Sequence, residues 1–185
     1  MEYTHPYLSP LGKITLASDG KALTGLWFDG QKYFGATLCR EHAEKDLPIF
    51  EQARQWLDRY FSGEIPDFTP LLKPRATAFQ KAVWDILLSI PYGQTITYSE
   101  IAGAIARQRG LARMSAQAVG GAVGHNPISI VIPCHRVVGI NGSLTGYAGG
   151  IAVKEKLLRL EKADLSKYFV PRSGTVCAAA QRKGK

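Results

Sequence analysis

The spacing of apolar residues changes its period along the chain at a segment rich in glycine and proline. In the first part, apolar and polar residues alternate at Gly12–Ala17 and Leu23–Phe28, on either side of an Asp-Gly turn signal, which predicts a β-hairpin. Residues 48–61 instead repeat apolar side chains at the three-and-four spacing of one buried helix face. The chain is then interrupted by Gly63, Pro66, Pro70 and Pro74. We therefore expect a small α+β domain over residues 1–73 and a second domain over residues 74–163.

The second domain is predicted to be mainly helical. One amphipathic helix begins near Phe79 and stops before Pro91. A second helix begins at a capping box, in which Thr97 is followed three residues later by Glu100. If another short helix follows it after a turn, the two together suggest a helix-turn-helix.

The candidate for that third helix covers residues 116–123, with Ser115 as its N-cap, and consists almost entirely of alanine, glycine and valine. Each interior glycine costs a helix ~1 kcal/mol relative to alanine, so intrinsic propensity does not favour it. Its small side chains would let another surface, such as DNA, approach closely. Tight packing against a neighbouring helix is the simpler explanation, because the segment lacks the side chains that read bases in the major groove.

The net charge of +8 comes entirely from the second half of the chain. Residues 1–74 hold 8 Lys and Arg against 10 Asp and Glu, whereas residues 75–162 hold 10 against 4 and residues 163–185 hold 5 against 1. This distribution is typical of a surface that meets a polyanion such as nucleic acid, although it also serves solubility. Residues 164–185 are basic and lack periodicity, which predicts a disordered tail.

Composition and cysteine spacing argue against several classes of protein. No segment is apolar over the roughly 20 residues that a membrane span needs, and no basic start followed by an apolar stretch marks a secretion signal. We therefore expect a cytoplasmic protein that does not bind membranes. Cys39, Cys134 and Cys177 are odd in number and widely spaced, which argues against a disulfide framework and against a zinc site. We expect no metal and no cofactor.

The most informative segment ends a buried apolar run with Pro133, Cys134 and His135. An ordinary thiol has a pKa of ~8.5, so a nucleophilic cysteine needs a base or a positive charge nearby. Neighbouring residues in a strand point to opposite faces, so the cysteine and the histidine form a pair only if the backbone turns, which Pro133 makes credible. Without further context, a buried cysteine beside a histidine is more often structural than catalytic.

Further matches supply that context. The run Pro133-Cys134-His135-Arg136-Val137, with Asn126-Pro127 before it and residues 146–150 after it, resembles the active-site region of the O6-alkylguanine-DNA alkyltransferases. The resemblance extends over residues 79–161. Its matched positions include Phe79-Gln80, Val83-Trp84, Ile90-Pro91, Tyr98, Ala118-Val119-Gly120 and Lys154-Glu155.

The resemblance implies a fold and a reaction. The first half matches only in size and pattern, and would correspond to the family's small, ribonuclease H-like domain with an antiparallel sheet. The second half would be a winged-helix or helix-turn-helix domain that binds DNA and carries the reactive cysteine. Family members take the alkyl group from O6 of guanine onto that cysteine, here Cys134, once per molecule. The expected substrate is chiefly O6-methylguanine, with O4-methylthymine as an additional candidate.

The resemblance also implies roles for single residues. His135 would act as a base through a water, and Glu155 would orient its imidazole. Tyr98 would donate a hydrogen bond near the leaving guanine. Asn126 would order the turn between the helix-turn-helix and the active site. The substrate loop would contain Tyr147 and Ala148.

A base inside a duplex cannot reach a buried thiol, so the nucleotide must be flipped out, in this family from the minor groove. Gln117 stands where many members carry the arginine that fills the resulting gap, and we expect it to take that role. Arg109 and Arg113 would grip phosphates. The expected substrate- and DNA-binding set is completed by Ser115, Arg136 and Val137. We expect the protein to act as a monomer.

Two alternatives remain at this point. One is a noncatalytic alkyltransferase-like protein that binds alkylated DNA and recruits other repair factors, but such proteins replace the reactive cysteine, whereas Cys134 is present. The other is an unrelated cysteine hydrolase that uses Cys134 and His135. A hydrolase would turn over, and it would explain neither the basic half nor the helix of small residues.

Overall fold

A computed structural model describes residues 1–171. Its first part is a sheet of the strands β1 (Glu2–Ser9), β2 (Gly12–Ser18), β3 (Leu23–Phe28) and β4 (His42–Glu44) in the order β3-β2-β1-β4. The predicted hairpin is confirmed, because β2 pairs antiparallel with β3. The sheet is mixed rather than purely antiparallel, since β4 was not predicted and pairs parallel with β1 at the far edge.

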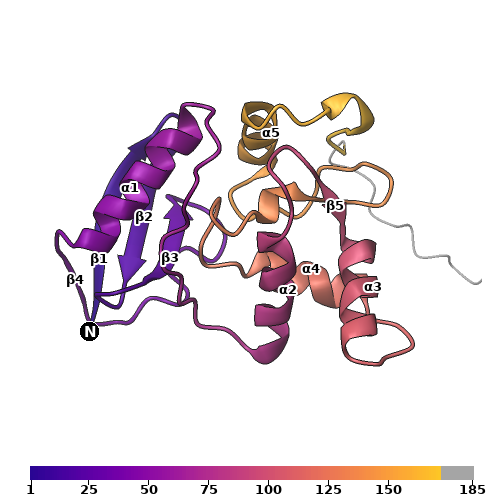
Figure 1. The fold of residues 1–185 in the computed structure, drawn as a ribbon, viewed down its shortest axis with the longest axis horizontal. Helices are drawn as coiled ribbons and strands as arrows, with labels where there is room; N and C mark the ends of the chain where they lie inside the picture. The colour runs from indigo at the N-terminus through magenta and orange to yellow at the C-terminus, as the bar shows by residue number, and fades with distance from the viewer. Residues whose placement is uncertain (172–185) are drawn as a thin grey trace, which may run out of the picture.

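Helix α1 (Pro48–Phe61) has the bounds that its periodicity predicts and lies against the sheet (Figure 1). Pro48 stands in its first turn, where a missing backbone N–H costs nothing. The apolar face of α1 is buried and includes Trp56, Leu57 and Tyr60. Tyr60 lies at the end of α1 that approaches the second domain.

The two domains are joined through strand β3. The segment after α1 runs back along this strand, where the Leu23 amide donates to Leu71 O at 2.8 Å. On the same strand, the Leu26 amide donates to Pro127 O at 2.8 Å and the Ser129 amide donates to Leu26 O at 2.9 Å. One hydrophobic core therefore continues from the sheet into the second domain.

The second domain contains helices α2 (Ala78–Leu88), α3 (Tyr98–Gln108), α4 (Ala116–Gly124) and α5 (Ile151–Leu160), and the short strands β5 (Ile96–Thr97) and β6 (Val137–Val138), which pair in parallel. The predicted caps are confirmed: Thr97 and Glu100 form a capping box, and the Ser115 hydroxyl accepts from the Ala118 amide. Helix α4 packs against α2 and α3, and Trp84 of α2 donates to Ala122 O at 2.9 Å. Tertiary contacts thus stabilise a helix that its own composition disfavours.

The prediction of a disordered tail from residue 164 is wrong for residues 164–170. Leu165–Lys167 form a short 3₁₀ helix, η2, and the Leu144 amide donates to Phe169 O at 2.9 Å. Leu165 and Tyr168 pack against a small apolar cluster of the second domain, which explains the order. The rest of the predicted tail, with Cys177 and its basic residues, lies outside the described residues. Within residues 1–171, no helix is long and apolar enough to cross a membrane.

Candidate active site

Asn126 organises the backbone that leads to Cys134. Its Oδ1 accepts from the Ile128 amide at 3.0 Å, and its Nδ2 donates to Ile132 O at 2.8 Å and to Cys134 Sγ at 3.1 Å. The apolar run is therefore a looped turn and not a strand, and Ile130 in it has a φ of 69°. Backbone strain at a β-branched residue persists only where the surroundings hold it, and here the Asn126 amide does so.

The reactive pair lies on a single turn of 3₁₀ helix, η1 (Cys134–Arg136), which begins after Pro133. The turn that the sequence makes credible is thus present. Cys134 is 5% exposed and His135 is fully buried. Burial raises the pKa of the Cys134 thiol, while the Asn126 hydrogen bond and the Lys154 charge act in the opposite direction. The resting thiol is therefore protonated at neutral pH and needs a proton acceptor to react.

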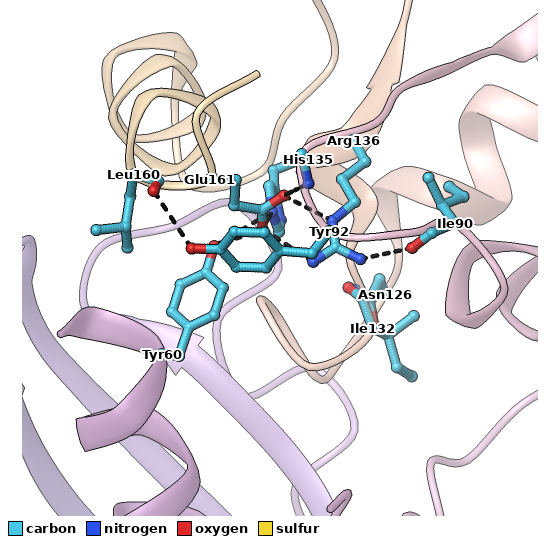
Figure 2. Close-up of polar contacts among 10 residues, drawn as sticks. Tyr60, Ile90, Tyr92, Asn126, Ile132, His135, Arg136, Leu160 and Glu161 are labelled. Carbon is cyan, nitrogen blue, oxygen red and sulfur yellow. Dashed lines mark hydrogen bonds and ion pairs between the residues drawn. The ribbon is translucent and has the colours of Figure 1, made fainter. Parts of the chain in front are cut away.

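His135 binds a carboxylate through Nε2, which lies 2.7 Å from Oε1 of Glu161 (Figure 2). Its Nδ1 is buried and has no hydrogen-bond partner among the described residues. Burial lowers the pKa of His135, although the contact with Glu161 opposes this shift. The imidazole is thus neutral at neutral pH, with a proton on Nε2 and a lone pair on Nδ1.

Glu161 is held by several donors. Its carboxylate accepts from Tyr60 Oη at 2.7 Å, from Arg136 Nε at 2.8 Å and from the Gly93 amide at 3.1 Å. Burial alone would raise the pKa of Glu161, but the hydrogen bonds from His135 and Arg136 and the positive charge of Arg136 outweigh burial and hold this pKa far below its usual range. Gly93 is required there, because a Cβ would lie 2.6 Å from Glu161 O and φ is +74°.

The expectation for Glu155 is wrong. Its side chain is partly exposed and forms an ion pair with Arg159, one turn along α5, at 2.7 Å. The carboxylate at His135 is Glu161, just after α5 ends. Lys154, Leu157, Leu158 and Glu161 are all buried and follow the three-and-four spacing of one helix face. This spacing is the sequence signal that could have identified Glu161.

Lys154 is a second buried charge that sequence reasoning missed. It is fully buried, and its Nζ donates to Thr145 O at 2.7 Å and to Val137 O. Burial lowers its pKa to about 8, and a negative charge on Cys134 would raise it again. Lys154 therefore ties the loop at Thr145 to the reactive turn and places positive charge near the thiol.

Tyr98, at the start of α3, contacts the loop after β6, and Tyr147 belongs to this loop. The Tyr98 hydroxyl donates to Thr145 O at 3.2 Å, and burial raises its pKa to about 12. Gly146 must be glycine, because a Cβ there would lie 2.5 Å from that hydroxyl. Tyr147 is 8% exposed, and its hydroxyl has no partner among the described residues.

A cavity of about 270 Å³ lies beside this loop. It is lined by Lys32, Tyr33, Gly120, Gly121, Gly124, His125, Gly146, Tyr147 and Ala148. The first two come from the N-terminal domain and were not predicted. The Lys32 amide donates to Ala148 O at 3.0 Å, and the Tyr33 ring stacks on His125 with the ring centres 4.1 Å apart. Both domains thus build the cavity.

The expected DNA-binding residues divide into two groups. Gln117, Ser115, Arg109 and Arg113 are exposed around the start of α4 and the turn before it. Arg136, with 11% of its side chain exposed, and the fully buried Val137 lie away from that exposed surface, and a contact of either residue with the substrate stays a prediction. The Arg136 guanidinium binds Glu161 and Ile90 O (Figure 2), and the Val137 side chain is fully inside the core.

No group of histidine, cysteine, aspartate and glutamate side chains within residues 1–171 could hold a metal ion. The geometry instead offers a buried thiol, a neutral imidazole with a free lone pair, and a carboxylate that fixes that imidazole. This arrangement can move a proton from sulfur to nitrogen and so activate the thiol for a displacement.

Comparison with known proteins agrees with this geometry. Residues 3–73 match the ribonuclease-like domain of 6-O-methylguanine DNA methyltransferase, and residues 78–163 match its DNA-binding domain. The chain is 44% identical to the methylated-DNA–protein-cysteine methyltransferase of Haemophilus influenzae over 86% of both chains. It is 48% identical to that of Mycobacterium tuberculosis over 84% of this chain and 89% of the relative.

Solved structures give the same result. The O6-methylguanine methyltransferase of Mycobacterium tuberculosis superposes with a TM-score of 0.74 at 45% identity, covering 88% of this chain and 93% of that one. A structure of the Mycobacterium tuberculosis protein in complex with DNA also gives a TM-score of 0.74 at 45% identity, covering 90% and 94% of the two chains. The chain therefore belongs to the 6-O-methylguanine DNA methyltransferase family.

Proposed function

We propose that this protein repairs DNA by transferring an alkyl group from O6 of guanine to Sγ of its own Cys134. The observation that carries the proposal is the buried Cys134 thiol on one 3₁₀ turn with His135, whose Nε2 is bound to Glu161 at 2.7 Å. The curated relatives, which share 44–48% of their residues with this chain, are named as methyltransferases of this type. The transfer is irreversible, because a thioether has no good leaving group.

The alkyl transfer is a single displacement. The thiol proton passes to Nδ1 of His135 through a water, the sulfur–carbon bond forms, and the carbon–O6 bond breaks with its electron pair going to guanine. The Asn126 amide and the Lys154 charge favour the thiolate, and Glu161 stabilises the imidazolium. The Tyr98 hydroxyl would donate to the leaving base as its negative charge develops, in exchange for its present hydrogen bond to Thr145 O.

Cys134 is 5% exposed, so the damaged nucleotide must leave the base stack to reach it. The cavity of about 270 Å³ over Tyr147 is near the lower limit of roughly 300 Å³ for small-molecule sites, which suits a single base. Helix α4 supports the DNA part of the proposal: a Cβ at Gly121 or Gly124 would meet open space, so this face can approach a minor groove closely. Gln117 would fill the gap that the flipped nucleotide leaves in the base stack, and Arg109 and Arg113 would bind phosphates.

The location follows from the chemistry. The reaction needs Cys134 as a free thiol, and thiols are kept reduced in the cytoplasm, where we propose that the protein acts. Cys134 and Cys39 are both free in the described part of the chain.

The test is the mass of the intact protein after incubation with a duplex that contains one O6-methylguanine. We expect a gain of one CH₂ per molecule, located on the Cys134 peptide and absent with an undamaged duplex. Cys39 is the internal control, and Cys134→Ser should bind the duplex without a gain. Damage-selective binding by the wild type without any gain would support a noncatalytic alkyltransferase-like protein instead. A duplex with O4-methylthymine tests the second substrate.

A further inference from the structure

One residue at the reactive centre comes from the other domain. Tyr60 belongs to α1, is fully buried, and points its hydroxyl between the catalytic histidine and its carboxylate (Figure 2). Its Oη lies 2.7 Å from Oε1 of Glu161 and 3.4 Å from Nε2 of His135. Within residues 1–171, no other side chain forms hydrogen bonds to both Glu161 and His135.

The hydroxyl has one hydrogen and bonds a carboxylate, which can only accept. Its hydrogen is therefore directed to Glu161, and its lone pairs can only receive a hydrogen from His135. This arrangement favours the tautomer with the proton on Nε2. The lone pair of His135 is then on Nδ1, the nitrogen without a protein partner. Burial holds the pKa of Tyr60 well above its usual value, so the hydroxyl stays a donor over the working pH range.

Other groups around the pair do not duplicate this contact. Arg136 binds both oxygens of Glu161, and the Gly93 amide binds Oε2. The Tyr92 hydroxyl is directed to Leu160 O at 3.3 Å. The Lys154 ammonium donates to Val137 O and Thr145 O, and the Tyr147 ring lies edge-on to the imidazole with the ring centres 6.4 Å apart.

We propose that Tyr60 is a positioning residue that the N-terminal domain supplies to the reaction, by holding Glu161 and fixing the His135 tautomer that receives the thiol proton. This inference rests on the proposed alkyl transfer. It gives the N-terminal domain a direct part in the chemistry, through one buried hydroxyl.

The test compares Tyr60→Phe with Tyr7→Phe in single-turnover methyl transfer from duplex O6-methylguanine across a range of pH. Tyr7 is a matched control, because its hydroxyl also donates to a carboxylate within the N-terminal domain, Asp58, at 2.8 Å. For Tyr60→Phe we expect the rate at neutral pH to fall roughly tenfold, the usual effect of losing a hydrogen bond to a charged group. We also expect the acidic limb of the profile to move to higher pH, because Glu161 with one donor fewer attracts the imidazolium more strongly.

Tyr7→Phe should leave the pH profile in place even if it lowers stability. A Tyr60→Phe profile that superposes on that of the wild type would overturn the inference and leave the proposed function intact. If Tyr60→Phe does not fold, the ¹⁵N shifts of His135 in the unmodified protein still test the tautomer that the inference requires. We expect a protonated Nε2 and a bare Nδ1, and the opposite tautomer would refute the inference. This second measurement does not depend on methyl transfer, so it separates the two proposals.

Discussion

Glu161 shows at the scale of a single residue how a charge is kept inside a protein. Its carboxylate is buried but accepts from Tyr60, His135, Arg136 and the Gly93 amide, so its desolvation is compensated by hydrogen bonds. The same bonds fix the imidazole beside the reactive thiol. The Glu161 side chain therefore contributes both to the packing of the site and to the orientation of His135.

Replacing Glu161 by Gln should abolish most methyl transfer. The amide can donate to Nε2 and so favours the wrong tautomer of His135, an effect that costs about 10³-fold or more in comparable triads. Glu155→Gln, in α5 six residues earlier, is the matched control, and we expect it to react at the wild-type rate, since Glu155 pairs with Arg159 and not with His135. Single-turnover kinetics measure both. Equal rates for the two variants would contradict the assignment of Glu161.

Glu161 should also make stability depend on acid. Its folded-state pKa lies below the unfolded value of about 4.3, so its contribution is fully present above that value. The contribution is lost as the pH falls from there toward the folded-state pKa. We expect the free energy of unfolding to fall more steeply below pH 4.3 in the wild type than in Glu161→Gln. Urea denaturation at several acidic pH values measures this difference, and parallel curves would rule it out.

At the scale of elements, α4 has a weak intrinsic helix propensity but is stabilised by contacts with its neighbours. Its Ser115 cap, its packing on α2 and α3, and the Trp84 hydrogen bond offset the cost of its glycines. As a result, the exposed face of α4 carries mostly small side chains, so another surface can approach its backbone closely. We propose that side chains at its first turn and across the cavity provide the remaining contacts with DNA.

Gln117 is exposed in the first turn of α4, and it should matter only when a base pair must be opened. We expect Gln117→Ala to slow repair of O6-methylguanine in a duplex by about tenfold and to change repair of the single strand little, because a single strand leaves no orphaned base. Gln52→Ala, in an exposed position of α1, is the control. An unchanged duplex rate for Gln117→Ala would exclude the wedge role.

Lys32 brings positive charge from the N-terminal domain to the edge of the cavity, with its Nζ 4.9 Å from the centre of the Tyr33 ring. We expect Lys32→Met to weaken duplex binding. The slope of log affinity against log salt concentration should also become shallower, by the amount expected for the loss of about one phosphate contact. Lys45→Met is the matched control, because Lys45 lies over the Tyr3 ring in a similar way and does not line the cavity. Binding titrations at several salt concentrations test this, and equal slopes for both variants would refute it.

At the scale of the whole molecule, the two domains share a core and a site. Strand β3 bonds the backbone at Pro127 and Ser129, Tyr60 reaches Glu161, and Lys32 holds Ala148. We therefore expect a single cooperative unfolding transition, with equal calorimetric and van 't Hoff enthalpies. Scanning calorimetry measures both enthalpies. Two separate transitions would mean that the domains unfold independently, against this expectation.

The sequence by itself determined several of the elements and the reactive turn. Periodicity located α1 and the β2–β3 hairpin, short-range capping placed the starts of α3 and α4, and Pro133 indicated the bend at Cys134. Each of these signals acts between residues a few positions apart, where backbone sterics and local hydrogen bonds decide the outcome. Resemblance to a family added the chemistry of Cys134 and His135.

Only the tertiary structure decided which distant groups meet at the site. Two glutamates follow Lys154 closely in the sequence, and the rotation of α5 and its end against η1 place Glu161, not Glu155, on His135. The burial of Arg136 and the entry of Tyr60 depend on how the two domains pack. Such contacts join residues up to 101 positions apart. A local spacing can mark Glu161 as buried, but it does not name the partner, because the energy of the contact comes from desolvation and pairing after the chain has folded.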